Sequence, residues 1–101
     1  MLAFEVSVNG KRRYIAGHRD EHSLQLILWG NNRSQRGASV NTFITVPNES
    51  PGGFATLSYP PELVGIGDEV TIRIVDVDKP DAPAKRNDGE GGYQIEIEAS
   101  E

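Results

Sequence analysis

The 101-residue chain contains no cysteine. Cysteine supplies disulfides, thiolate nucleophiles, zinc-finger ligands and iron–sulfur ligands, so the sequence excludes all four. Long apolar runs are lacking as well. No stretch approaches the roughly 20 apolar residues of a membrane span, and the opening MLAFEVSVNG has neither the basic nor the apolar region of a signal peptide. We therefore expect a soluble, cytoplasmic protein with no membrane partner.

Positive charge is scarce in the second half of the chain. Residues 1–50 carry six Lys or Arg against four Asp or Glu, a net charge of +2, whereas residues 51–101 carry four against eleven, a net charge of −7. An acidic protein is repelled by phosphate backbones. Aromatic residues, which stack on bases, make up only 7% of the chain. We expect no nucleic-acid partner.

Sequence motifs for catalysis are also missing. The chain has no G-x-S-x-G nucleophile elbow, no P-loop and no dinucleotide-binding fingerprint. These patterns place a nucleophile or a phosphate at a strand end, and without them no catalytic residue can be assigned. The sequence therefore favours binding over catalysis, and we expect no cofactor.

What the chain does contain is alternation of apolar and polar residues, which is typical of half-buried strands. Residues 2–8 alternate in this way and are followed by Asn9–Gly10, a pair that favours a type I′ turn, and then by a return strand at 11–16. The pattern predicts further strands at residues 39–46, 54–59, 68–77 and 93–99.

Residues 23–29, SLQLILW, fit two interpretations. Leu24, Ile27 and Leu28 have helical spacing, and Gly30 could end either a helix or a strand. The segment is short and the rest of the chain has strand patterns, so we favour a strand that is buried on both faces at the centre of a sheet.

Composition predicts two connections. Residues 62–67 are expected to cross irregularly or as one helical turn. Residues 78–92 hold two prolines, three glycines and seven charged residues, which predicts a long mobile loop. The strands flanking that loop would then pair, with Arg73 near Glu96 or Glu98. Together these elements predict one all-β domain, an antiparallel β-sandwich or small open barrel of about seven strands with at most one short helix.

Two clusters of polar residues are candidate sites. His18 and His22 flank the sequence Arg19-Asp20-Glu21 and could hold a transition metal, although the zinc-protease pattern would need Glu at position 19. An exposed polar turn is the alternative. The predicted loop at 78–92 carries a second cluster, which could contact another protein or serve only as a solubilising loop: Asp78, Asp81, Asp88 and Glu90.

These observations favour a non-enzymatic protein-binding or assembly module, of the inhibitor, immunity or adaptor type, whose partner is another protein. The alternative is a small-ligand or metal-dependent activity centred on His18–His22. An open sheet also leaves edges that can pair with a second copy, so a homodimer through an edge strand is possible.

The segments FEVSVNGK at residues 4–11, Ala16–Gly17 and GDEVTIRIV at residues 67–75, followed by Pro80 and Pro83, resemble a group of small uncharacterised bacterial proteins. The resemblance covers about half of the chain. It implies a bacterial cytosolic setting and no particular activity or catalytic residue.

Overall fold

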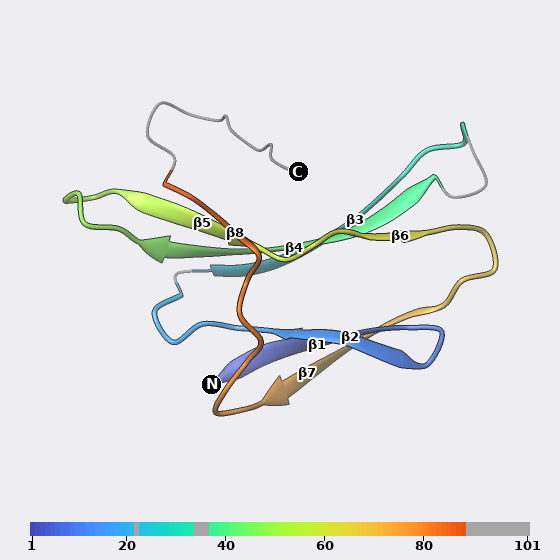
Figure 1. The fold of residues 1–101 in the computed structure, drawn as a ribbon, viewed down its shortest axis with the longest axis horizontal. Coiled ribbons are helices and arrows are strands. Elements are labelled where there is room, and N and C mark those ends of the chain that lie inside the picture. Colours follow the sequence, from blue (N-terminus) through green and yellow to red (C-terminus); the bar gives the residue numbers. More distant parts are fainter. Residues whose placement is uncertain (22, 34–36, 89–101) are drawn as a thin grey trace.

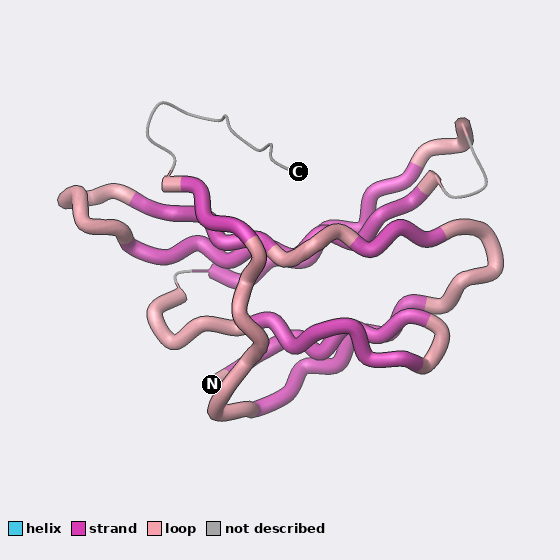
Figure 2. Tube along the Cα trace, in the orientation of Figure 1, coloured by secondary structure: helices cyan, strands magenta, loops and turns pink. Residues whose placement is uncertain are grey.

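A computed structural model describes residues 1–21, 23–33 and 37–88, and within them the chain forms eight strands and no helix (Figure 1 and Figure 2). The three-stranded sheet, in the order β2-β1-β7, consists of β1 (Leu2–Val8), β2 (Lys11–Ala16) and β7 (Val70–Asp76). The five-stranded sheet has the order β3-β4-β5-β8, with β6 paired to β4, and consists of β3 (Ser23–Gly30), β4 (Ala38–Pro47), β5 (Phe54–Ser58), β6 (Glu62–Val64) and β8 (Lys85–Asn87).

The two sheets face each other as layers, and every strand pair in them is antiparallel (Figure 1). The prediction of an all-β domain is confirmed, and the sheets do not close into a barrel. The short strands β6 and β8 were not predicted. The strand expected at residues 93–99 lies outside the described residues.

The first hairpin turns as the Asn9–Gly10 pair predicts. Asn9 and Gly10 have positive φ angles of 53° and 81°, the conformation of a type I′ turn. The turn is also tied to the start of β7, because the Asn9 N–H donates to the carbonyl of Glu69 and the Asn9 side chain bonds Asp68 and the Glu69 N–H. The hairpin and β7 therefore form one continuous sheet.

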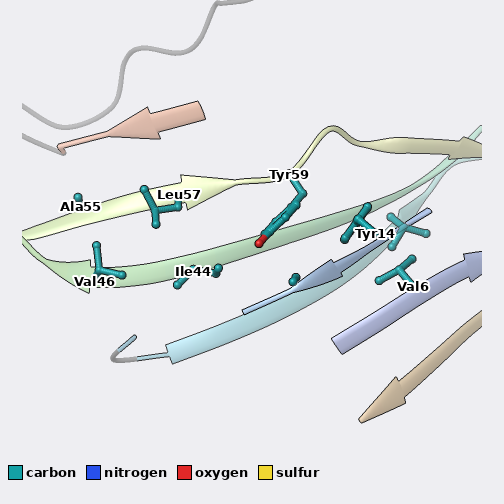
Figure 3. Close-up of a cluster of buried hydrophobic side chains, with 9 residues drawn as sticks. Val6, Tyr14, Ile44, Val46, Ala55, Leu57 and Tyr59 are labelled. Atoms are coloured by element: carbon teal, nitrogen blue, oxygen red, sulfur yellow. The ribbon is translucent and has the colours of Figure 1, made fainter. Parts of the chain in front are cut away.

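The core lies between the two layers and is built from alternate residues of the central strands. Val40, Thr42, Ile44 and Val46 of β4 all point inward and are buried, as the period of two predicts. Complete burial of an Ile or Val side chain contributes about 1.5–3 kcal/mol. The buried cluster comprises Val6, Tyr14, Ala16, Val40, Ile44, Val46, Ala55, Leu57 and Tyr59, most of which are labelled in Figure 3.

Two buried tyrosines join the sheets at the centre of this core. The rings of Tyr14 on β2 and Tyr59 just after β5 stack with centroids 4.8 Å apart and planes 11° apart. The Tyr14 hydroxyl shares a hydrogen bond of 2.7 Å with the hydroxyl of Thr42. The Tyr59 hydroxyl accepts from the Gly17 N–H and donates to the carbonyl of Asp81 at 2.6 Å. Both buried hydroxyls are thus satisfied, as burial requires.

Residues 77–84, here called the strap, run from the end of β7 to the start of β8 and cross between the layers (Figure 1). The Asp81 N–H donates to the Ile15 carbonyl at 2.8 Å, and the Asp81 carboxylate accepts from the Ile15 N–H at 2.8 Å. The Ala84 N–H then donates to the carbonyl of Ser58. The strap is therefore bonded to β2 and to β5.

The long loop expected at residues 78–92 contains the short strand β8, and the strap within it is bonded to both sheets. Composition predicts a segment surrounded by solvent. In the structure, the Asp81 N–H bonds the edge of β2, and β8 pairs with the edge of β5. These hydrogen bonds are formed by backbone groups, which composition does not report. Residues 89–92 lie outside the described residues.

Two further assignments need correction. Residues 23–30 form a strand, as favoured, but β3 is an edge strand with four exposed residues in its second half rather than a buried central strand. Its apolar character on both faces led to that error, because such a run is typical of buried strands. Residues 62–64 pair with β4 instead of crossing irregularly.

We predict that Tyr59→Phe lowers the free energy of unfolding by about 1–3 kcal/mol, since it leaves the Gly17 N–H and the Asp81 carbonyl without their hydroxyl partner. Urea denaturation measures the change. The double variant Tyr14→Phe with Thr42→Val is the control, because it removes both partners of one hydrogen bond together and should cost less. Equal losses in the two variants would contradict the role given to Tyr59.

Burial raises the pKa of Tyr14 and of Tyr59 above the ordinary value of 10.0, because desolvation penalises the phenolate. The unfolded chain therefore releases these protons first as the pH rises. Stability should be intact below about pH 10 and fall as the pH rises from there through the folded-state pKa values. Urea midpoints measured across this range test the prediction, and Tyr14→Phe with Tyr59→Phe should flatten the decline. A decline of unchanged steepness in that variant would show that other groups cause it.

Candidate functional site

The two lateral sides of the sandwich differ. Tyr14 of β2 contacts both Thr42 of β4 and Tyr59, so β2 lies against β4 and β5. The strap closes this side by bonding β2 and β5. In the three-stranded sheet, β2 lies next to the strap and β7 lies farthest from it. In the five-stranded sheet, the strand farthest from the strap is β3. The strands β3 and β7 are therefore the edges of the side opposite the strap.

That side exposes apolar side chains of the inner face. On β3, Leu24 and Leu26 are partly buried against the core, whereas Leu28 is 64% exposed. On β7, Ile72 is 43% and Ile74 is 71% exposed, although Val6, the partner of Ile72 on β1, is buried in the core. These five residues, Leu24, Leu26, Leu28, Ile72 and Ile74, define what we call the open side.

Backbone groups on the open side also lack strand partners in the described part of the chain. The Asn31 N–H donates to the Gly37 carbonyl, and by the alternation of an antiparallel ladder the odd residues of β3 bond β4. The N–H and C=O groups of the even residues therefore face outward. The hydrogen bond from the Asn9 N–H to the Glu69 carbonyl sets the same alternation on β7. The backbone N–H and C=O groups of Ile72 and Ile74 therefore point away from β1. Each edge thus combines apolar side chains with backbone donors and acceptors that no strand of residues 1–21, 23–33 and 37–88 pairs with.

The acidic residues proposed for protein binding do not form one cluster in the described chain. Asp81 is held against β2 through its own backbone and carboxylate. Asp88 pairs with Arg86, and its carbonyl accepts from the Asn48 side chain beyond the end of β5. Asp78 is exposed on the strap, and Glu90 lies outside the described residues. Asp81 serves to position the strap, which composition could not indicate.

Among the candidate metal ligands, only His18 is described. Its Nδ1 accepts a hydrogen bond from the Asp20 N–H at 3.0 Å, which closes a local turn and leaves Nε2 as its remaining ligand atom. His22 lies outside the described residues, so the proposed pair stays a prediction. Within residues 1–21, 23–33 and 37–88, no three His, Asp or Glu side chains are grouped so that they could hold a metal ion.

Three arginines of the three-stranded sheet are paired with carboxylates. Glu5 at the centre of the three-stranded sheet lies 3.1 Å from Arg73 and 3.8 Å from Arg12. Arg13 pairs with Glu62 at 2.8 Å. Arg73 thus has a partner on the neighbouring strand β1, while its expected partners, Glu96 and Glu98, lie outside the described residues. These exposed pairs contribute about 0–1 kcal/mol each.

Sequence reasoning did not identify the open side. A signal was present: β3 has eight residues, none of them charged, and five of them are large and apolar. Such a run was interpreted as a buried strand because the strand order was unknown. Only the topology shows that it forms an edge.

Comparison with known proteins adds no relative. No family model matches the chain, and neither the curated proteins nor the solved structures give a match. The described residues form no helix that is long and apolar enough to cross a membrane. The candidate site is therefore defined by the geometry alone.

We predict that Asp81→Ala lowers the free energy of unfolding by about 0.5–1.5 kcal/mol and speeds hydrogen exchange of the Ile15 amide, because the carboxylate that accepts from this amide is removed. Asp78→Ala is the matched control, since Asp78 is exposed on the same strap, and it should change neither quantity. Urea denaturation and amide exchange give the two readouts. If both variants behave alike, Asp81 does not hold the strap.

Proposed function

We propose that this protein is a non-enzymatic protein-binding or assembly module and that the open side is its binding surface. The observation that carries the proposal is the exposure of inner-face apolar side chains on both edge strands, β3 and β7, at one side of the sandwich. Exposed apolar side chains that are surrounded by polar residues are typical of interaction sites.

The free backbone groups support the same conclusion. An extended segment that pairs with β3 or β7 gains hydrogen bonds from the backbone, and its alternate side chains can cover Leu28 or Ile74. This mode needs no pocket and no catalytic group. It fits a small domain whose central tyrosine hydroxyls are both engaged in holding the sheets together.

We predict that a photo-crosslinking residue placed at Leu28 or Ile74 captures a protein in cells of the source organism, whereas the same residue at Leu63 does not. Leu63 is the matched control because it is also a leucine with 64% exposure, but it lies on β6, away from the open side. Products are separated by mass and identified by mass spectrometry. Equal yields from all three positions would mean that exposure alone decides the capture and would contradict the proposal.

A further inference from the structure

We propose that β3 pairs with β3 of a second copy of this chain, forming an antiparallel dimer in which the two five-stranded sheets become one continuous sheet. This inference rests on the proposed function, since it names the occupant of one edge of the open side. Three features favour this pairing: the unprotected edge of β3, the symmetry of the contact and the absence of charge along the strand.

Among the described strands, β3 is the sheet edge with the least protection. The edge of β2 is occupied by Asp81 of the strap, β7 carries Arg73 at its centre, and β8 has three residues of which Lys85 and Arg86 are charged. Natural sheets protect their edges by such charges, short strands or covering segments. β3 has eight residues, no charge and no proline, and no segment of the described chain covers it.

The strand is also able to pair with itself. A two-fold axis perpendicular to the sheet brings like faces together, so an inner-face residue must lie opposite another inner-face residue. With the axis at Ile27, Leu26 lies opposite Leu28 of the second copy, and the two Ile27 side chains meet on the outer face. The outward N–H and C=O groups of the even residues then form about eight new hydrogen bonds. Leu28 and Ile27, which are 64% and 48% exposed, become covered.

The absence of charge along β3 favours this pairing. No residue of the strand is charged, so like charges never lie directly opposite each other, an arrangement that would be destabilising. The uncharged strand itself adds no repulsion between two copies that each carry a net charge of −5.

The second copy is the occupant that these features favour over an unrelated strand, because β3 carries no charge that would meet its like and its exposed apolar residues then cover one another. One strand pair buries less surface than a standard protein interface. We therefore expect a dimer that dissociates on dilution.

The test is the molar mass of the full chain, measured by light scattering over about a hundredfold range of concentration. We expect a mass near twice that of the monomer at the high end. Ile27→Lys should give a monomer throughout, since two lysines would then lie directly opposite each other. Leu63→Lys on β6, away from the open side, is the control and should leave the dimer intact. Urea denaturation of dilute samples establishes that each variant is folded.

Charge reversal at the axis tests the register. Ile27→Glu alone should also give a monomer, and an equimolar mixture of Ile27→Glu with Ile27→Lys should restore the dimer, because opposite charges then face each other. A wild-type mass that stays monomeric at every concentration overturns the dimer. If crosslinks from Leu28 to a different protein persist in that case, only the dimer fails and the proposed function stands. A dimer insensitive to Ile27→Lys and to charge reversal overturns the pairing through β3.

Discussion

The hydroxyl of Tyr59 is the point on which the arrangement of the layers depends. It accepts from the Gly17 N–H beyond the end of β2 and donates to the Asp81 carbonyl of the strap, while its ring stacks on Tyr14. One side chain thus joins the five-stranded sheet, the three-stranded sheet and the segment that connects them. A buried hydroxyl with both partners in place contributes specificity as well as stability, since any displacement of one layer leaves polar groups unsatisfied.

Closure on the strap side has a consequence for the opposite side. The chain has one segment that crosses beside β2 and β5, and the structure shows no equivalent segment over β3 and β7 within the described ranges. In that part of the chain, the inner-face side chains of β3 and β7 are only partly covered, and no strand pairs with the outward backbone groups of either edge. The same topology that secures the core at Tyr14 and Tyr59 leaves apolar side chains exposed at the opposite edge of each sheet, on β3 and β7.

The sequence predicted local structure well where period and turn chemistry decide it. The Asn9–Gly10 turn and the inward residues of β4 follow from residue type and alternation. The exposed position of β3 could not be predicted in this way, because a strand with apolar residues on both faces has the same pattern at an edge as at the centre of a sheet. The strap was missed for a related reason, since Asp81 acts largely through backbone groups that every residue type possesses. Of the predicted site residues, the acidic ones that are described lie apart, and the open side emerged only from the strand order.

Hydrogen exchange of the β3 amides, measured in dilute and in concentrated protein, tests the central claim most directly. The account predicts that the Gln25 and Ile27 amides, which face β4, are protected in both samples. The amides of Leu24, Leu26 and Leu28 should exchange freely in the dilute sample and become protected in the concentrated one. Protection of these three amides in dilute protein would show that the chain itself covers β3, and free exchange at every concentration would show that β3 does not pair with a second copy. Either result would contradict the account.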